Sequence, residues 1–257
     1  MSTREMKTAP AGMPTVRCHA FPDCVKEPFW FFDNDSAMKA HPQYQEAKSG
    51  GKEAAVEVIA DLALDFLVQI KDKLPENAIF VAPHAREATG DNAIPQVLAA
   101  ACAMVMQSQV ETDIVQVTRV FHTGADPMER MSLRAEFDGL VLRGAHYVLV
   151  DDVVNMGGTL AELANYLLAR GGLVSAVVVL VNAGRDKHFL PTKAVIRKLK
   201  GRYGNEIREI FGIDSSALTA NEASYLIGFR TADEIRNRLA KARKETRLRL
   251  RSKGIGK

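Results

Sequence analysis

Residues 147–162 constrain the fold and the chemistry of this chain more than any other stretch. The apolar run Tyr147–Val150, rich in β-branched residues, is typical of a buried parallel strand. Two carboxylates, Asp151 and Asp152, follow at its end, and a short loop then leads to Thr159, which opens a helix. Because ligands of open α/β sheets bind at the carboxyl ends of strands, beside helix N-termini, this order predicts a binding site here.

The loop after the acidic pair suits a phosphate group. Gly157 and Gly158 allow close backbone approach and offer successive N–H groups to an anion. Neighbouring carboxylates suit vicinal hydroxyls or a bound Mg²⁺. The loop lacks the lysine of a P-loop and the Gly-x-Gly-x-x-Gly of a dinucleotide site. The stretch predicts a sugar-phosphate site. The alternative, an ordinary crossover, would leave two adjacent carboxylates repelling each other without compensation.

With apolar strand, acidic pair, glycines and threonine in this order, residues 147–160 resemble the PRPP-binding motif of the type I phosphoribosyltransferases (PRPP is phosphoribosyl pyrophosphate). The resemblance implies that the chain binds PRPP with Mg²⁺ and transfers the 5-phosphoribosyl group to a nucleobase-like acceptor, releasing pyrophosphate. Asp151 and Asp152 would hold the ribose hydroxyls and the metal, directly or through water. The residues implied for the 5′-phosphate are Val154, Asn155, Met156, Gly157, Gly158 and Thr159.

Two loop positions depart from the family pattern. In the hypoxanthine-guanine branch, an Asp at the position of Asn155 is proposed as a proton acceptor, a role that an amide cannot fill. Met156 replaces a common hydroxyl residue, which leaves more of the phosphate binding to backbone amides. Thr159 could bond the phosphate or form a capping box with Glu162, and both roles start the helix at the same place.

Strand-like and helix-like segments alternate along the chain, which indicates βαβ units. We expect an α/β fold with a central, mostly parallel sheet in residues 51–190, an irregular N-terminal arm in 1–50 and a helical C-terminal extension in 191–257. The expected strands are 78–82, 114–120, 147–150 and 173–181, and the expected helices are 52–73, 94–106, 160–169, 205–211, 220–226 and 232–250.

Two further segments fit the same sheet edge. The strand that ends at Ala82 runs into a loop, residues 83–92, which the resemblance assigns to pyrophosphate. Its candidate contacts are His84, Ala85 and Arg86, of which the guanidinium suits phosphate oxygens best. The connection over residues 121–145 is long enough for a lid, and we assign catalytic roles to its Arg130 and Arg134.

Composition favours a globular protein of the reducing cytoplasm. Apolar residues make up 47% and charged residues 25%, which argues against disorder. No apolar run is long enough for a membrane span, and Met1–Pro14 lack the core of a secretory signal. Three cysteines cannot all pair. A zinc site at Cys18, His19 and Cys24 would have unusual spacing and no evident fourth ligand.

Charge is concentrated at the C-terminal end. Residues 230–257 hold 11 Lys and Arg against 3 Asp and Glu, so this tail carries +8 and the remaining residues −5 of the total of +3. Such a tail could be a solvated face or could bind nucleic acid. A phosphoribosyltransferase, a PRPP- or nucleotide-sensing regulator that binds nucleic acid through this helix, and an interaction protein with a decayed site all stay open. We expect a homodimer.

Overall fold

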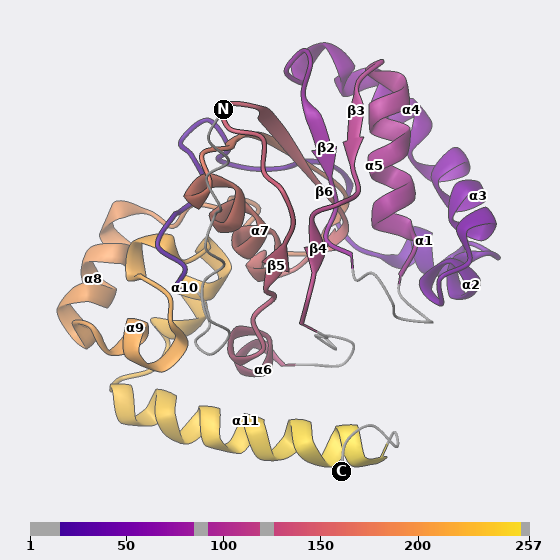
Figure 1. Cartoon of the computed structure of the whole chain (residues 1–257). Coiled ribbons are helices and arrows are strands. Elements are labelled where there is room, and N and C mark those ends of the chain that lie inside the picture. The colour runs from indigo at the N-terminus through magenta and orange to yellow at the C-terminus, as the bar shows by residue number, and fades with distance from the viewer. Residues whose placement is uncertain (1–15, 85–91, 119–125, 253–257) are drawn as a thin grey trace, which may run out of the picture.

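A five-stranded parallel sheet forms the centre of the molecule (Figure 1). The computed structural model describes residues 16–84, 92–118 and 126–252, apart from the side chains of 249–252. In spatial order the strands are β1 (Phe29–Phe32), β7 (Leu173–Asn182), β6 (His146–Val154), β2 (Ile79–Val81) and β3 (Gln109–Glu111). Every neighbouring pair is parallel, which confirms the α/β class.

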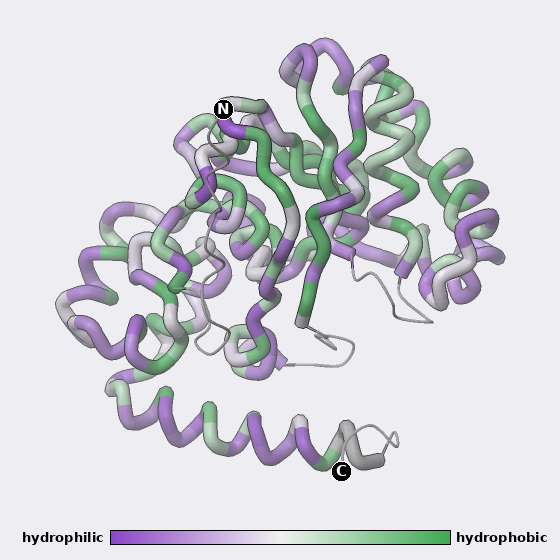
Figure 2. The backbone as a smooth tube through the Cα atoms, viewed as in Figure 1, coloured by the Kyte–Doolittle hydropathy of each residue, from purple (hydrophilic) through white to green (hydrophobic). Residues whose placement is uncertain are grey.

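Helices cover both faces of the sheet, so its central strands are mostly apolar (Figure 2). Along β6, Tyr147 and Leu149 pack with helix α7, whereas Val148 and Val150 pack with helices α3 and α5 on the other face. The bounds of the helices before the C-terminal extension are α1 (Ser36–Ala40), α2 (Tyr44–Lys48), α3 (Lys52–Leu62), α4 (Leu64–Ile70), α5 (Ile94–Val105), α6 (Pro127–Ser132) and α7 (Gly158–Ala169).

The N-terminal segment is more regular than its prolines suggest. Its aromatic run Phe29–Phe32 is the edge strand β1, paired with β7 in the register Phe29 to Val178. Residues 36–48, also expected to be irregular, form α1 and α2. The single helix expected over 52–73 is interrupted at Ala63 and ends in a 3₁₀ turn at Lys71–Lys73.

The connection expected to act as a lid contains structure of its own. The strand expected at 114–120 does not join the main sheet. Instead β4 (Val115–Gln116) pairs antiparallel with β5 (Phe137–Asp138), and α6 lies between them in sequence. The backbone N–H of Gln116 donates to the carbonyl of His84 at 2.6 Å, which joins this small sheet to the segment after β2.

The helical C-terminal extension is confirmed. It comprises α8 (Lys193–Tyr203), α9 (Glu206–Phe211), α10 (Ala220–Leu226) and α11 (Ala232–Ser252), with a 3₁₀ turn at Ser215–Ala217. These helices share a core with α6, through Met128 and Met131. Thr219 and Glu222 have the sequence spacing of a capping box, and this capping box starts α10. None of the helices in the described part of the chain has the length and apolar character needed to cross a bilayer.

Candidate functional site

The acidic pair lies within β6, because this strand continues to Val154 instead of ending at Val150. Its neighbour β2 ends earlier, with Val81 opposite Leu149. Asp151 and Asp152 therefore project past the end of β2, at the carboxyl edge of the sheet where the chain leaves β2 toward His84. The other neighbour, β7, accompanies β6 along its whole length and supports the pair from one side.

Asp152 is a buried carboxylate held by three donors. Its Oδ2 atom accepts a hydrogen bond from Lys48 Nζ at 2.7 Å and one from Asn92 Nδ2 at 2.8 Å. Its Oδ1 atom accepts from the backbone N–H of Val153 at 2.8 Å. The side chain is only 6% exposed, so these bonds and the ion pair compensate for the loss of water.

Lys48 and Asn92 are site residues that the sequence did not indicate. Lys48 is the last residue of α2, and its charge compensates Asp152 from 104 positions away. Asn92 is the last residue of the loop assigned to pyrophosphate, and its Oδ1 also accepts the N–H of Ile94 at the start of α5. Asn92 thus ties the exit of one predicted phosphate loop to the strand that carries the other.

The two carboxylates differ in their electrostatic environment. Burial, and secondly the charge of Asp152, raise the pKa of Asp151 well above its usual range. Its Oδ1 accepts one backbone bond, from the N–H of Asp152 at 2.9 Å. Burial alone would lower the Lys48 pKa, but Asp152 outweighs this and raises it, which keeps Lys48 positively charged. Asp151 is therefore the carboxylate that gains most from a cation or a hydrogen-bond donor on a ligand.

The loop from Val154 to Thr159 turns sharply at Gly157. Gly157 has φ +76°, a left-handed conformation that strains any residue with a Cβ atom. An added Cβ would also lie 3.4 Å from Phe189 and from Thr219. The Thr219 hydroxyl donates to the Met156 carbonyl at 2.6 Å, so the C-terminal extension fixes the loop. The turn leads directly into the N-terminus of α7, and the free backbone N–H groups of a helix N-terminus can bind an anion.

Of the two roles considered for Thr159, the capping box with Glu162 does not form. Helix α7 begins at Gly158 with Gly157 as its N-cap, and no side chain caps it. Glu162 instead binds arginines from two distant segments. The half-buried Thr159 hydroxyl thus has no capping role in α7.

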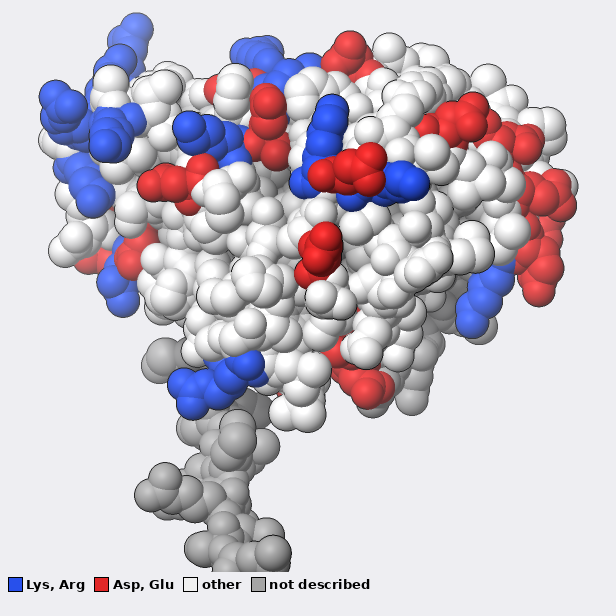
Figure 3. Space-filling view, turned by 90° about the horizontal axis from the view of Figure 1, so that it is seen from above, with Lys and Arg blue, Asp and Glu red and all other residues white. Residues whose placement is uncertain are grey.

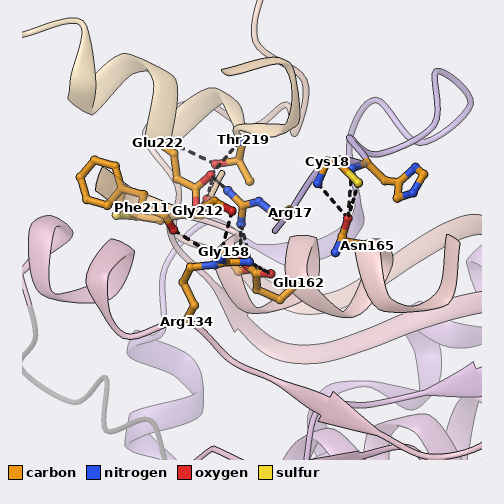
Figure 4. Close-up of polar contacts among 12 residues, drawn as sticks. Arg17, Cys18, Arg134, Gly158, Glu162, Asn165, Phe211, Gly212, Thr219 and Glu222 are labelled. Carbon is orange, nitrogen blue, oxygen red and sulfur yellow. Dashed lines mark hydrogen bonds and ion pairs between the residues drawn. The ribbon is translucent and has the colours of Figure 1, made fainter. Parts of the chain in front are cut away.

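Those arginines form a buried ionic cluster below the loop (Figure 4). Arg134 makes a two-pronged bond with Glu162, with Nε and Nη2 each 2.7 Å from a carboxylate oxygen. Arg17, 1% exposed, pairs with Glu162 at 3.2 Å and also with Glu222 of α10. Two positive and two negative charges therefore link the N-terminal segment, the lid connection, α7 and α10.

The structure brings only some of the other predicted site residues near the acidic pair or the buried ionic cluster. Arg134 lies in the ionic cluster and also donates to the carbonyls of Phe211 and Gly212, so its predicted catalytic role would have to be combined with a structural one. Arg130 is half-buried on α6, and its role stays a prediction. His84 contacts the Ala82 carbonyl at 3.2 Å. Ala85 and Arg86 lie outside the described residues.

The two cysteines considered for a zinc site, Cys18 and Cys24, contact different parts of the molecule. The Cys18 N–H donates to Asn165 at 3.1 Å, and the Cys24 thiol lies 3.9 Å from the Val174 carbonyl. In residues 16–84, 92–118 and 126–252, no three His, Cys, Asp or Glu side chains are grouped as metal ligands. Mg²⁺ needs fewer protein ligands, because it is usually bound by one or two carboxylates together with substrate phosphates and water. Asp151 and Asp152 fit that requirement.

Comparison with known proteins agrees with this geometry. The model of the phosphoribosyl transferase domain matches residues 59–201, more than half of the chain. Protein TraN of Escherichia coli is 35% identical over 215 residues, covering 81% of this chain and 48% of TraN. A hypoxanthine/guanine phosphoribosyltransferase of Methanohalobium evestigatum is 35% identical over 74 residues, or 27% of this chain and 39% of that protein. The match thus spans about half the length of TraN and a smaller part, 39%, of the Methanohalobium evestigatum protein.

Among solved structures, adenine phosphoribosyltransferase from Leishmania donovani aligns at 16% identity with a TM-score of 0.36, covering 76% of this chain and 87% of that one. The family model, which spans both the loop after β2 and the acidic strand, carries the assignment. The chain belongs to the phosphoribosyl transferase domain family.

Proposed function

We propose that this protein is a phosphoribosyltransferase that binds PRPP with Mg²⁺ and transfers the 5-phosphoribosyl group to a nucleobase or related amine, releasing pyrophosphate. One observation carries the proposal: the acidic pair projects past the end of β2, between a glycine turn and the segment after β2. A donor with phosphates at both ends of its ribose needs two anion sites flanking a hydroxyl-binding site, and this edge of the sheet offers that order.

The chain's own residues suit the binding of the donor. Asp151 and Asp152 retain lone pairs that can accept hydrogen bonds from the ribose hydroxyls. The backbone N–H groups at Gly157 and Gly158 face the 5′-phosphate in the proposal, with the N-terminal end of α7 adding its dipole. Lys48 supplies a positive charge beside the acidic pair, which lowers the repulsion between those carboxylates and an anionic donor.

Departure of pyrophosphate requires stabilisation of its growing charge. Bound Mg²⁺, held by Asp151 and Asp152 directly or through water, would supply part of that charge stabilisation. We assign the rest to the loop over residues 83–92, including His84 and Arg86, and to Arg130 of the lid connection. Holding donor and acceptor in line lowers the barrier further, since the transfer needs no covalent help from the protein.

The side chain of Asn155, in the predicted phosphate loop, limits which acceptors can react. Asn155 is exposed and has an amide side chain, so it cannot take a proton from the incoming base. Its backbone carbonyl lies against Gly184, where a Cβ would come within 2.8 Å, so a side chain at 184 would displace the loop. We therefore propose an acceptor that reacts without a carboxylate base at this position.

The proposal is tested by PRPP-dependent release of pyrophosphate. The full chain is incubated with PRPP, Mg²⁺ and single members of a panel of purines, pyrimidines and small amines, and pyrophosphate is measured by a coupled assay. We expect release with at least one acceptor. Loss of one charged hydrogen-bond partner costs about 1.5–3 kcal/mol, so Asp151→Asn or Asp152→Asn should lower kcat/KM about 10-fold to 150-fold.

Asp72→Asn is the matched control, because Asp72 is an exposed carboxylate in the 3₁₀ turn after α4. This variant should keep wild-type turnover. Pyrophosphate release that is equal in all four proteins would show that the acidic pair is not the donor site. Donor binding without release for any acceptor would show that the protein binds PRPP without transferring it.

A further inference from the structure

The C-terminal extension carries a separate feature, a basic surface on α8 that the proposed transfer reaction does not use. Residues 191–257 contain 17 of the 34 Lys and Arg of the chain but only 7 of the 31 Asp and Glu. This part has a net charge of +10, which leaves −7 for residues 1–190. Helix α8 lies at the outer end of the extension, and Figure 3 shows Lys and Arg side chains gathered at that end of the molecule.

Helix α8 is strongly basic along its exposed side. No Asp or Glu occurs between Asp186 and Glu206 in the sequence. Five cations of the helix are exposed and form no ion pair with any described residue: Lys193, Arg197, Lys198, Lys200 and Arg202. Lys193, Arg197 and Lys200 follow the spacing i, i+4, i+7, so they line one side of the helix as a ridge about 10 Å long. We call these three residues the α8 ridge.

The rest of α8 is fixed in place by its inner side. Leu199 and Tyr203 are buried in the core of the extension, and the Tyr203 hydroxyl lies within hydrogen-bond distance of the carbonyls of Leu226 and Phe229, at 2.8 and 2.6 Å. Arg202 also donates to the Ile227 carbonyl, at 2.7 Å. These contacts present the ridge on a rigid helix.

The ridge opposes the stability of the helix that carries it. Lys193 with Arg197, and Arg197 with Lys200, are like-charge neighbours at helical spacing, and such neighbours destabilise a helix. Lys193 also lies in the first turn, where the helix dipole disfavours a positive charge. A surface needed only for solubility would mix the two signs of charge. An anionic partner would relieve this repulsion.

We propose that the α8 ridge binds the phosphate backbone of a nucleic acid. A row of cations about 10 Å long matches a few successive phosphates of one strand, which are about 3.4 Å apart along the axis of a duplex. None of the exposed large apolar side chains of the described residues lies on α8, so the helix has no side chains to insert into a membrane. Contacts of this kind fix position without reading sequence, so we expect weak sequence preference.

The test is fluorescence anisotropy of a labelled single-stranded RNA of about 30 nucleotides, and of a duplex DNA of the same sequence, titrated with the full chain at several salt concentrations. The variant is the triple replacement Lys193→Gln, Arg197→Gln and Lys200→Gln. We expect it to bind the favoured probe at least about 10-fold more weakly near 0.1 M salt. Each phosphate contact on a single strand contributes about 0.7 to the magnitude of the slope of log K against log salt. Loss of three contacts should therefore reduce the magnitude of this slope by about 2.

The matched control replaces three exposed lysines of the acidic part with Gln: Lys52, Lys71 and Lys73. This protein loses the same charge and should bind like the wild type. Because the ridge residues repel one another, its triple variant should unfold at a temperature equal to or above that of the wild type. Loss of binding with retained stability separates a binding surface from a structural one.

Three outcomes overturn the proposal: unchanged binding by the ridge variant, an equal loss in both triple variants, or sedimentation with phosphatidylglycerol vesicles without any shift of RNA or DNA. Binding of RNA alone, or of duplex DNA alone, supports it and identifies the strand type. The result is independent of PRPP binding, which is measured separately on the same proteins.

Discussion

The buried ionic cluster gives a sharp prediction for Glu162→Gln. Glu162 neutralises parts of two guanidinium groups, Arg134 through two bonds of 2.7 Å and Arg17 at 3.2 Å, and its side chain is 6% exposed. The substitution changes the net charge of the cluster from zero to +1 without changing its shape. Removing one partner of a buried pair costs about 3–5 kcal/mol of unfolding free energy, because the other charge stays buried without compensation.

The loss can be measured by urea unfolding and by thermal melting. For a chain of this size about 1 kcal/mol corresponds to about 2–4 °C, so Tm should fall by roughly 6–20 °C. The matched control is Asp35→Asn, which breaks the ion pair between Asp35 and Lys39. The side chain of Asp35 is 34% exposed and that of Lys39 is 57% exposed. A pair so well solvated should contribute less than about 1 kcal/mol.

A second substitution shows whether the effect comes from the pair itself. Arg134→Met should destabilise the wild type strongly but the Glu162→Gln protein much less, with a coupling energy of about 1–3 kcal/mol. If Glu162→Gln costs no more than Asp35→Asn, or if the two substitutions are additive, the reasoning about the cluster is refuted.

Three further predictions concern single positions. Gly157→Ala should lower the free energy of unfolding by about 1 kcal/mol in urea titrations and weaken PRPP binding, because φ of +76° strains a residue with a Cβ atom; unchanged values would show that the turn tolerates one. Because burial raises the Asp151 pKa, the charged form weakens the fold as the pH rises above the ordinary value of 3.8. Asp151→Asn should therefore resist urea better than the wild type near pH 8 in metal-free buffer, with little difference near pH 3, and a stability difference independent of pH would contradict this. Burial raises the pKa of the Cys102 thiol to about 12, so iodoacetamide near pH 8 should label Cys18 and Cys24 while Cys102 stays unmodified by mass spectrometry; equal labelling would refute its burial.

Local signals in the sequence were sufficient for the centre of the site. The run from Tyr147 to Thr159 carries its own strand, acidic pair and glycine turn. The structure confirms the strand and the turn, although the strand continues to Val154 and includes the acidic pair. Likewise Thr219 and Glu222 predicted the start of α10, because a capping box is made by residues three positions apart.

Contacts between distant segments could not be predicted in the same way. Lys48 and Asn92 reach Asp152 across 104 and 60 positions, and nothing near them in sequence signals a carboxylate. Glu162 has the spacing of a capping box with Thr159, but two arginines compete for its carboxylate and bind it more strongly. Prolines and aromatics suggested an irregular arm, whereas the open edge of β7 lets the run Phe29–Phe32 pair as a strand.

The central claim is that the carboxyl edge of β6 binds PRPP, and isothermal titration of Mg²⁺-PRPP into the full chain tests it most directly. We predict saturable binding at one site per chain by the wild type. Asp152→Asn, which removes a charge held by Lys48 and Asn92, should lower the affinity about 10-fold or more. Absence of binding by the wild type, or equal affinity of the two proteins, would contradict the claim.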